Sequence, residues 1–283
     1  SGSNHIHFIG KEISSQIQID LFRQFEISHL TLQIPLDNDG DIFEKFSLKF
    51  KRVEDAIFID LPEKLKVGST YILSISYVGE PNVAKRAPWD GGFVWGKDSL
   101  KRDFVGVACE GHGASSWWPC KDHLSDEPDS MKMTYTVPAG YDCISNGINS
   151  GKIIDTSQAD SLVLNNVFEW KVSYPINTYN VSFYLGKYKE ITGQYISSND
   201  TLKTSFYALD YNEAKAIKQF EQVNPMLRVY EDLFGKFPFW NDGYKLVEAP
   251  YLGMEHQTAI AYGNGYQNGY RGNQPKGVDF DYI

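Results

Sequence analysis

Residues 244–263 read YKLVEAPYLGMEHQTAIAYG and place one carboxylate between two strand-like runs. The first apolar run covers 244–247, and the second, 258–262, carries the chain away from the turn. Glu255 lies between them. A carboxylate whose backbone is held between two strands suits a group that must meet a ligand at a defined place. The alternative is an ordinary solvated glutamate on a surface turn.

The composition is that of an ordinary globular protein. The chain has 283 residues, which suits one large domain or two. Its apolar fraction of 42% and charged fraction of 22% are typical of such proteins. The net charge of −9 argues against nucleic acid as a partner, because phosphate binding needs a basic face. The same charge disfavours adhesion to an anionic membrane surface.

The sequence leaves the compartment open. No uninterrupted apolar run approaches the roughly 18–20 residues that a membrane-spanning helix needs, so we expect no membrane span. No basic segment followed by an apolar one is visible at the start, so no signal peptide is predicted. The three cysteines, Cys109, Cys120 and Cys143, form no Cys-x-x-Cys pair, and at least one of them is interpreted as a buried free thiol.

Alternation of apolar and polar residues predicts a mainly β amino-terminal region. The predicted strands are 16–21, 46–50, 56–61, 70–78, 131–137, 167–172, 180–187 and 202–209, with 51–55 as a hairpin connection. Many short strands between Gly, Pro, Asn and Asp turns indicate an antiparallel β domain, either a sandwich or an open saddle.

The pattern changes near residue 209. Asp210 to Asn212 offer helix N-cap chemistry, and apolar residues at spacings of three and four predict a helix over 213–234. Pro225 should kink or split this helix, and Gly235 is a plausible C-cap. The change from strands to helix predicts two domains, 1–193 and 194–283.

A long turn-rich segment, 81–128, interrupts the strands and contains a second notable acid. Its tryptophans are interpreted as packing residues rather than ligand platforms. Glu110 follows an apolar run and precedes Gly111, which lets another chain approach closely. If Glu110 and Glu255 converge on one pocket, the two carboxylates would suit a cation such as an amine. The residues alone leave this convergence open.

Other catalytic and metal-binding patterns are missing from the sequence. No two histidines lie four apart on a helix, as a His-Glu-x-x-His zinc site requires. No Gly-x-Ser-x-Gly elbow and no phosphate-binding glycine loop occur. The acidic cluster of Asp122, Asp126, Glu127 and Asp129 lacks calcium-loop spacing and is interpreted as a solvated loop.

Several motifs, in their order and separation, resemble the M1 (gluzincin) family of zinc aminopeptidases, most closely a bacterial branch. The stretch 252–256, LGMEH, is similar to the family's Gly-x-Met-Glu-Asn, and it follows YEDLFGKFPF at 230–239 and KLVEAP at 245–250. Upstream, ACE at 108–110 and PCKD at 119–122 resemble the family's Gln-x-Glu and Pro-Cys-x-Asp, and Ser-Asn-Gly follows at 145–147.

The resemblance implies a fold and a mechanism. The mainly β domain would be followed by the start of an α+β, thermolysin-like catalytic domain. Glu255, helped by Glu110, would bind the free α-amino group of a peptide substrate. The backbone of Gly253 and Met254 would pair with the substrate as an added strand. A zinc ion would activate water and polarise the scissile carbonyl.

Three departures from the family's pattern matter. Leu252 and His256 replace the first and last residues of its motif, which puts the path of that strand in doubt, and Ala108 replaces its glutamine. The zinc-binding His-Glu-x-x-His and the later glutamate are absent. We therefore expect the front part of a longer aminopeptidase, with no catalytic residue, no zinc ligand and no activity of its own.

The alternatives are a non-catalytic binding or scaffold protein that keeps the M1 framework without metal, and an unrelated β-sandwich interaction domain.

Overall fold

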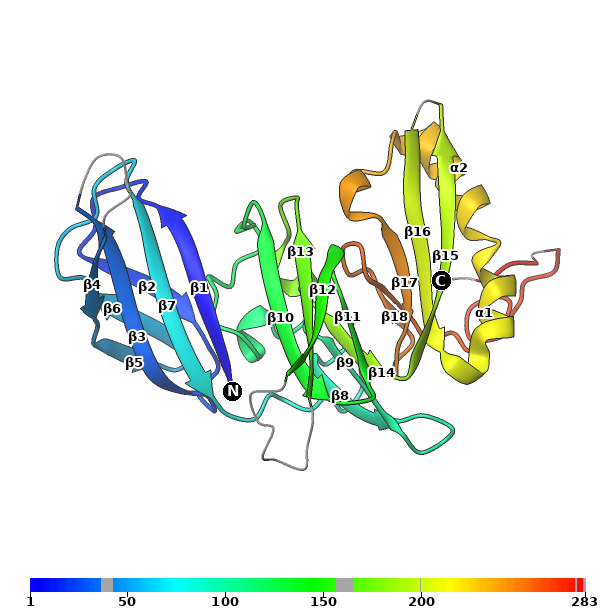
Figure 1. Ribbon diagram of the computed structural model, residues 1–283, viewed down its shortest axis with the longest axis horizontal. Helices are drawn as coiled ribbons and strands as arrows, with labels where there is room; N and C mark the ends of the chain where they lie inside the picture. Colours follow the sequence, from blue (N-terminus) through cyan, green and yellow to red (C-terminus); the bar gives the residue numbers. More distant parts are fainter. Residues whose placement is uncertain (37–42, 156–164, 199, 278, 282–283) are drawn as a thin grey trace. The chain divides into compact units, whose positions relative to one another are not determined.

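A computed structural model of the chain describes residues 1–36, 43–155, 165–198, 200–277 and 279–281 (Figure 1). The chain forms two compact units. The first combines Ser1–Asn82 with His112–Asp126, and the second combines Val83–Gly111 with Glu127–Ile283. Both notable acids, Glu110 and Glu255, belong to the second unit.

The first unit consists of two antiparallel sheets around one apolar core. The strand orders are β1-β7-β3-β4 and β2-β6-β5. The strands are β1 Gly2–Ile9, β2 Gln16–Asp20, β3 Glu26–Pro35, β4 Phe43–Ser47, β5 Phe50–Val53, β6 Ala56–Asp60 and β7 Thr70–Val78. In β7 the alternate residues Tyr71, Leu73 and Ile75 are each 1% exposed and pack in one core with Ile57 and Ile59 of β6. This alternation confirms the predicted antiparallel β class.

The strands predicted at 46–50 and the connection at 51–55 are wrong in detail. The chain passes from one sheet to the other at this point: β4 pairs with β3, whereas β5 pairs with β6 in the second sheet. Only residues 54 and 55 form the turn between β5 and β6. The regular alternation of Phe46, Leu48 and Phe50 cannot reveal that the chain crosses from one sheet to the other, because a strand shows the same alternation in either sheet.

The second unit contains three further sheets. Their orders are β10-β13-β12, β11-β14-β9-β8 and β15-β16-β17-β19-β18. The strands are β8 Gly92–Lys97, β9 Asp103–Ala108, β10 Met131–Pro138, β11 Asp142–Ser145, β12 Ile148–Asp155, β13 Asn165–Val172, β14 Phe183–Gly186, β15 Tyr188–Ser197, β16 Asp200–Leu209, β17 Tyr244–Glu248, β18 Gly253–Met254 and β19 Ile260–Tyr262. The first two sheets are antiparallel.

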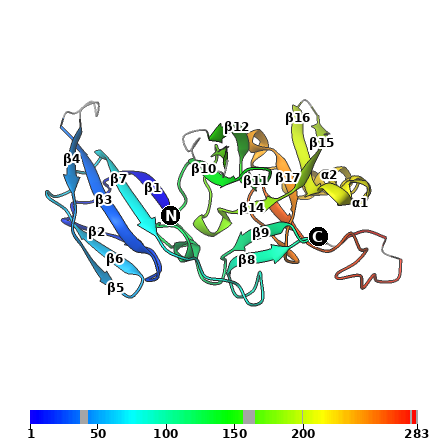
Figure 2. The same cartoon turned by 60° about the horizontal axis from the view of Figure 1, so that its bottom comes forward.

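The five-stranded sheet is mixed and carries the helices. Strand β17 is parallel to both β16 and β19, and the two outer pairs are antiparallel. A parallel connection needs a crossover, which α1 (Glu213–Phe220) and α2 (Val223–Phe234) supply between β16 and β17. Both views show these helices beside β15 and β16 (Figures 1 and 2). Ala216, Val223 and Leu227 share a buried core with Phe206 and Leu246 of the sheet.

The predicted helix over 213–234 is split, as expected, but at a different residue. The break lies between α1 and α2, and Pro225 is the third residue of α2. Proline is tolerated there because amides of the first turn have no intrahelical acceptor. Asn212 is the N-cap residue of α1, within the predicted 210–212, but its side chain makes no capping bond and donates instead to Glu248. Gly235 ends α2 at φ 93°, as predicted.

The division into 1–193 and 194–283 stays a prediction. Residues 193 and 194 lie within β15, which pairs with β16 along its length. The chain therefore enters the mixed sheet at Tyr188, a few residues before the predicted boundary. All three cysteines are buried thiols outside any disulfide, which confirms the expectation made for at least one of them. Among the described residues, no helix is both long enough and apolar enough to cross a membrane.

The three-ten turns complete the description. They are η1 Ala114–Ser116, η2 Thr178–Asn180, η3 Asp210–Asn212 and η4 Trp240–Asp242.

The tryptophans of the turn-rich segment differ in burial: Trp118 is 7% exposed and packs as predicted, whereas Trp89 and Trp95 are more than half exposed. Asp122, from the acidic cluster, accepts the amide hydrogens of Ala114 and Ser115 at the start of η1.

Candidate functional site

Glu255 follows an edge strand of the mixed sheet. Strand β18 is the last strand in the described sheet order and pairs only through Gly253 with Tyr262 and Met254 with Ala261. Its other side has no strand partner among the described residues. The chain then turns through Glu255 and the buried residues 256–259 into β19. The predicted pair of strands around this carboxylate is confirmed.

The segment before β18 is hydrogen-bonded both to the residue that follows β19 and to β9. The amide of Gly263 donates to the carbonyl of Leu252 at 2.8 Å. A Cβ at Gly263 would collide with the carbonyl oxygen of Tyr251, so this close approach requires glycine. The hydroxyl of Tyr251 donates to the Val107 carbonyl at 2.9 Å. This bond links the Glu255 segment to β9, the strand that leads to Glu110.

Glu255 is exposed and accepts a hydrogen bond from Tyr179, which lies in η2. The distance between the Tyr179 hydroxyl and Glu255 Oε1 is 3.2 Å. The pKa of Tyr179 is raised, first by burial, then by the charge of Glu255 and this hydrogen bond, and also by the charge of Glu110. Tyr179 therefore keeps its proton at neutral pH and is within electrostatic range of both carboxylates.

Glu110 is connected to Tyr179 through a contact of Cys109, the residue before it. The buried thiol of Cys109 donates to the Tyr179 carbonyl at 3.5 Å, and Glu110 itself is exposed. The Tyr179 hydroxyl thus contacts Glu255, and its backbone carbonyl contacts the residue before Glu110. Sequence reasoning missed Tyr179, because no local pattern relates it to Glu255, 76 positions away.

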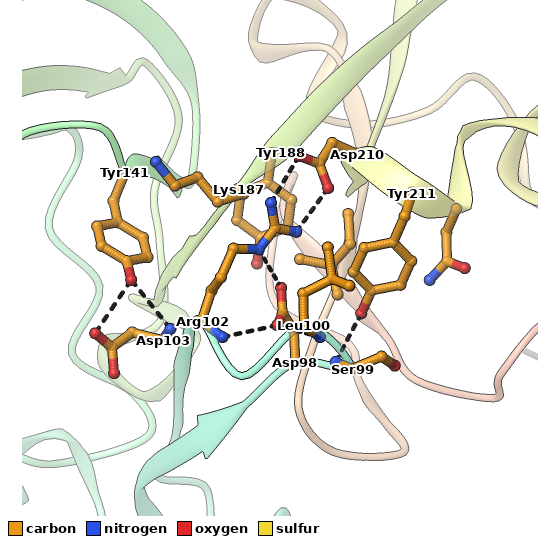
Figure 3. Close-up of polar contacts among 12 residues, drawn as sticks. Asp98, Ser99, Leu100, Arg102, Asp103, Tyr141, Lys187, Tyr188, Asp210 and Tyr211 are labelled. Atoms are coloured by element: carbon orange, nitrogen blue, oxygen red, sulfur yellow. Dashed lines mark hydrogen bonds and ion pairs between the residues drawn. The ribbon is translucent and has the colours of Figure 1, made fainter.

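The hairpin that carries β9 is fixed by the ion pairs of Arg102 (Figure 3). Its guanidinium donates to Asp98 at 2.7 Å and, through two nitrogens, to Asp210 at 2.7 and 2.6 Å. The Asp98 side chain is fully buried. The Arg102 hydrogen bond is the first cause of the lowered pKa of Asp210. The amide of Ser99 also donates to the Tyr211 hydroxyl at 3.2 Å. The β8–β9 hairpin is therefore anchored to η3.

Asn146, of the Ser-Asn-Gly motif, holds the two sides of the site together. Its side-chain nitrogen donates to the carbonyls of Asn180 at 2.9 Å and Gln257 at 2.6 Å. Its oxygen accepts from the Ser182 amide at 2.8 Å. Asn146 is fully buried, so these bonds satisfy a polar group that would otherwise be costly to bury. The Asn146 amide therefore joins the segments next to Tyr179 and Glu255, and the backbone amide of Gln257 adds a direct bond to the Asn180 side chain at 3.0 Å.

Gly147 forms a hydrogen bond with Thr258, a strained residue in the turn that follows Glu255. Thr258 has φ 57°, which is unfavourable for a β-branched residue. Its hydroxyl accepts from the Gly147 amide at 2.8 Å. Strain of this kind persists only where the surroundings hold it. The turn after Glu255 is therefore rigidly positioned.

His256, the departure from the family's motif, is fully buried. Its Nδ1 lies 2.7 Å from the Tyr184 hydroxyl, which donates its single hydrogen to the Ala259 carbonyl at 2.8 Å. Nδ1 must therefore carry the hydrogen of the neutral ring. Nε2 has no partner within the described part of the chain. Burial lowers the pKa of His256 to about 3. His256 therefore packs as a neutral, buried ring in the turn that follows Glu255.

The described residues do not fit a zinc site. No group of three or more His, Cys, Asp or Glu side chains in this part of the chain could hold a metal ion. The zinc that the sequence resemblance implies has no ligand set here, and no reaction step is derived through it.

Comparison of the sequence with protein-family models and with curated proteins finds no match. Solved structures do match. An M1 zinc metallopeptidase from Deinococcus radiodurans aligns over 95% of this chain and 56% of its own, with 19% identity and a TM-score of 0.71. A mutant of an M1 zinc metallopeptidase from the same organism, bound to a Tyr-Ser-Ala substrate, aligns over 92% of this chain and 55% of its own, with 20% identity and a TM-score of 0.72.

A third structure, a two-domain M1 zinc metallopeptidase mutant bound to L-arginine, gives 19% identity and a TM-score of 0.72 over 92% of this chain and 55% of its own. The chain thus spans little more than half the length of these proteins. The resemblance stated from the motifs is confirmed at the level of the fold. This chain therefore has the mainly β fold of the M1 zinc metallopeptidases, over about half of their length.

Proposed function

We propose that this chain is the amino-terminal part of a zinc-dependent aminopeptidase of the M1 type, in which Glu255 and Glu110 bind the α-amino group of peptide substrates. The observation that carries the proposal is the hydrogen bond from Tyr179 to the exposed carboxylate of Glu255. Cys109, the residue before Glu110, donates to the Tyr179 carbonyl, and the charge of Glu110 is among the causes that raise the pKa of Tyr179. The fold likeness supports it, as do the amino acid and the peptide bound in the similar structures.

The geometry suits recognition of a chain terminus. Charge-assisted hydrogen bonds from an ammonium to two carboxylates are among the stronger polar contacts in proteins. The free side of β18 can accept the substrate backbone as an added strand at Gly253 and Met254. Anchoring the amine and the backbone together would place the first peptide bond at a fixed position.

The bound zinc would supply an activated water and polarise the scissile carbonyl. Its ligands would come from residues beyond the chain described here, so we propose that this chain alone does not hydrolyse peptides. The second candidate is a binding or scaffold protein that keeps this framework without metal. Both candidates predict amine binding, and only the first predicts peptide hydrolysis by the full-length protein.

The test is replacement of Glu255 by Gln in the full-length protein. We expect kcat/KM for leucine p-nitroanilide to fall about 100-fold or more, equivalent to about 3 kcal/mol, because one charged contact to the amine is lost. Glu221→Gln, at an exposed position after α1, is the matched control and should leave kcat/KM unchanged. Unchanged kcat/KM in the Glu255 variant would rule out this carboxylate as the amine anchor.

A further inference from the structure

A separate cavity of about 330 Å³ lies beside the segment that leads into β18. Leu252, the residue before β18, lines it, and so does Gly263, whose amide donates to the Leu252 carbonyl. Of the described residues that line this cavity, Arg271 alone has a charged side chain. Neither Glu110 nor Glu255 lines it, so the cavity lies outside the proposed amine site.

Arg271 is held in place by aromatic rings and by its own backbone. Its guanidinium lies over the rings of Trp89 and Tyr270, at 5.8 and 5.9 Å from the ring centroids. Its backbone amide donates to the side-chain oxygen of Asn264, a buried residue, at 2.9 Å. Within the described part of the chain, no carboxylate forms an ion pair with this guanidinium. A positioned arginine of this kind is suited to bind an anion.

Two contacts place this arginine close to the amine site. The cavity that it lines reaches Leu252, and the distance along the chain from Leu252 to Glu255 is roughly 10 Å when extended. On the other side, a Cβ at Gly111 would lie 3.3 Å from the carbonyl oxygen of Trp89, so the Trp89 backbone packs against the residue after Glu110. All of these residues belong to the second unit. The arginine therefore lies close to residues that neighbour both proposed amine-binding acids.

We propose that Arg271 binds the terminal carboxylate of short peptides and makes the protein selective for tripeptides that have a free carboxyl end. This inference rests on the proposed function. A substrate that is anchored by its amine at Glu255 and pairs with β18 runs backwards along this strand towards Leu252. At about 3.3 Å per extended residue, the carboxylate of a tripeptide lies roughly 10 Å from its amine, which brings it beside the cavity.

Charge and geometry both favour a carboxylate at this position. A guanidinium can donate two parallel N–H bonds to the two oxygens of a carboxylate. A peptide amide carries no charge and presents a single oxygen, so it cannot form this pair. The rings of Trp89 and Tyr270 limit the movement of the guanidinium, so less conformational entropy is lost when the peptide binds.

The test is hydrolysis of Leu-Gly-Gly and Leu-Gly-Gly-amide by the full-length protein, with the released leucine measured. We expect kcat/KM to be about tenfold higher for the free acid, mainly through a lower KM, because the amide lacks one charged contact. In Arg271→Gln this preference should fall to about twofold or less. Arg271→Lys keeps the charge without the fork and should retain a preference of about threefold. Each preference is a ratio within one protein, so a general loss of activity in a variant cancels.

Arg228→Gln is the matched control, because Arg228 is also exposed, lies over the Tyr195 ring at 6.0 Å and does not line the cavity. It should keep the full preference. If Arg271→Gln kept it too, another group would bind the carboxylate and the assignment of Arg271 would be wrong. Equal hydrolysis of the two peptides by the wild-type protein would overturn this inference and leave the proposed function standing. If neither peptide were hydrolysed, the proposed function and this inference would both be wrong.

Discussion

At the scale of single residues, the candidate site depends on buried polar groups behind exposed acids. Glu255 and Glu110 face solvent, whereas Asn146, His256 and Thr258 are buried and hydrogen-bonded. Hydrogen bonds among buried groups make a segment rigid. The turn that carries the exposed carboxylate of Glu255 is therefore held by buried residues next to it.

The buried imidazole of His256 should make stability depend on pH. Its pKa is about 3 in the folded chain, against about 6.5 in the unfolded chain. As the pH falls below 6.5, only the unfolded chain takes up this proton, so stability is lost progressively towards pH 3. Between pH 7 and pH 5 the free energy of unfolding should fall by about 2 kcal/mol from this group alone.

Urea unfolding of wild type and His256→Asn at both pH values measures this effect. The asparagine variant should lack the additional loss, whereas His29→Asn, at an exposed position, should retain it. Parallel pH profiles for wild type and His256→Asn would show that the ring is accessible to protons in the folded chain.

At the scale of elements, the β8–β9 hairpin depends on Arg102. Among the described residues, the Arg102 side chain alone joins the buried Asp98 to Asp210 (Figure 3). Arg102→Ala should lower the free energy of unfolding by about 1–3 kcal/mol, because hydrogen bonds to charged groups are lost. Amide hydrogen exchange should also become faster in residues 97–103.

Lys97→Ala is the control on the same hairpin. The pair of Lys97 and Asp103 is exposed on both sides, and such surface pairs contribute little to stability because solvent screens them. Equal losses in the two variants would mean that the hairpin is held by its strand pairing rather than by Arg102. In that case the position of Glu110 would not depend on this anchor.

At the scale of the whole molecule, the chain carries about half of a known fold and, on the proposed function, a site for an amine. Its net charge of −9 argues against nucleic acid as a partner, because phosphate binding needs a basic face. The chain covers only 55–56% of the length of the similar structures. On the proposed function, recognition of the substrate terminus and binding of the metal therefore belong to different parts of the protein.

Metal content tests this separation. After dialysis against zinc, residues 1–283 alone should retain far less than one zinc per chain and show no aminopeptidase activity, because the described residues contain no ligand set. The full-length protein should retain one. Stoichiometric zinc together with activity in residues 1–283 would contradict this prediction, and zinc-free full-length protein would favour the binding-protein alternative.

The sequence alone predicted several strands and the helical segment, and it singled out the two acids as candidates. The alternation over Thr70–Val78 predicted β7 with its correct bounds, and the spacing over 213–234 predicted the helices. These patterns depend on neighbours in sequence, so they can be read from it. The ordered motifs around Glu110 and Glu255 indicated the M1 fold, which the solved structures share.

The tertiary structure alone decided what surrounds those acids. Tyr179 reaches Glu255 across 76 positions, and Asn146 reaches Gln257 across 111. The exchange of sheets between β4 and β5 and the burial of His256 were hidden for the same reason. Contacts between distant segments are set by how whole sheets pack, and a side-chain pattern along one strand is the same whichever sheet it joins.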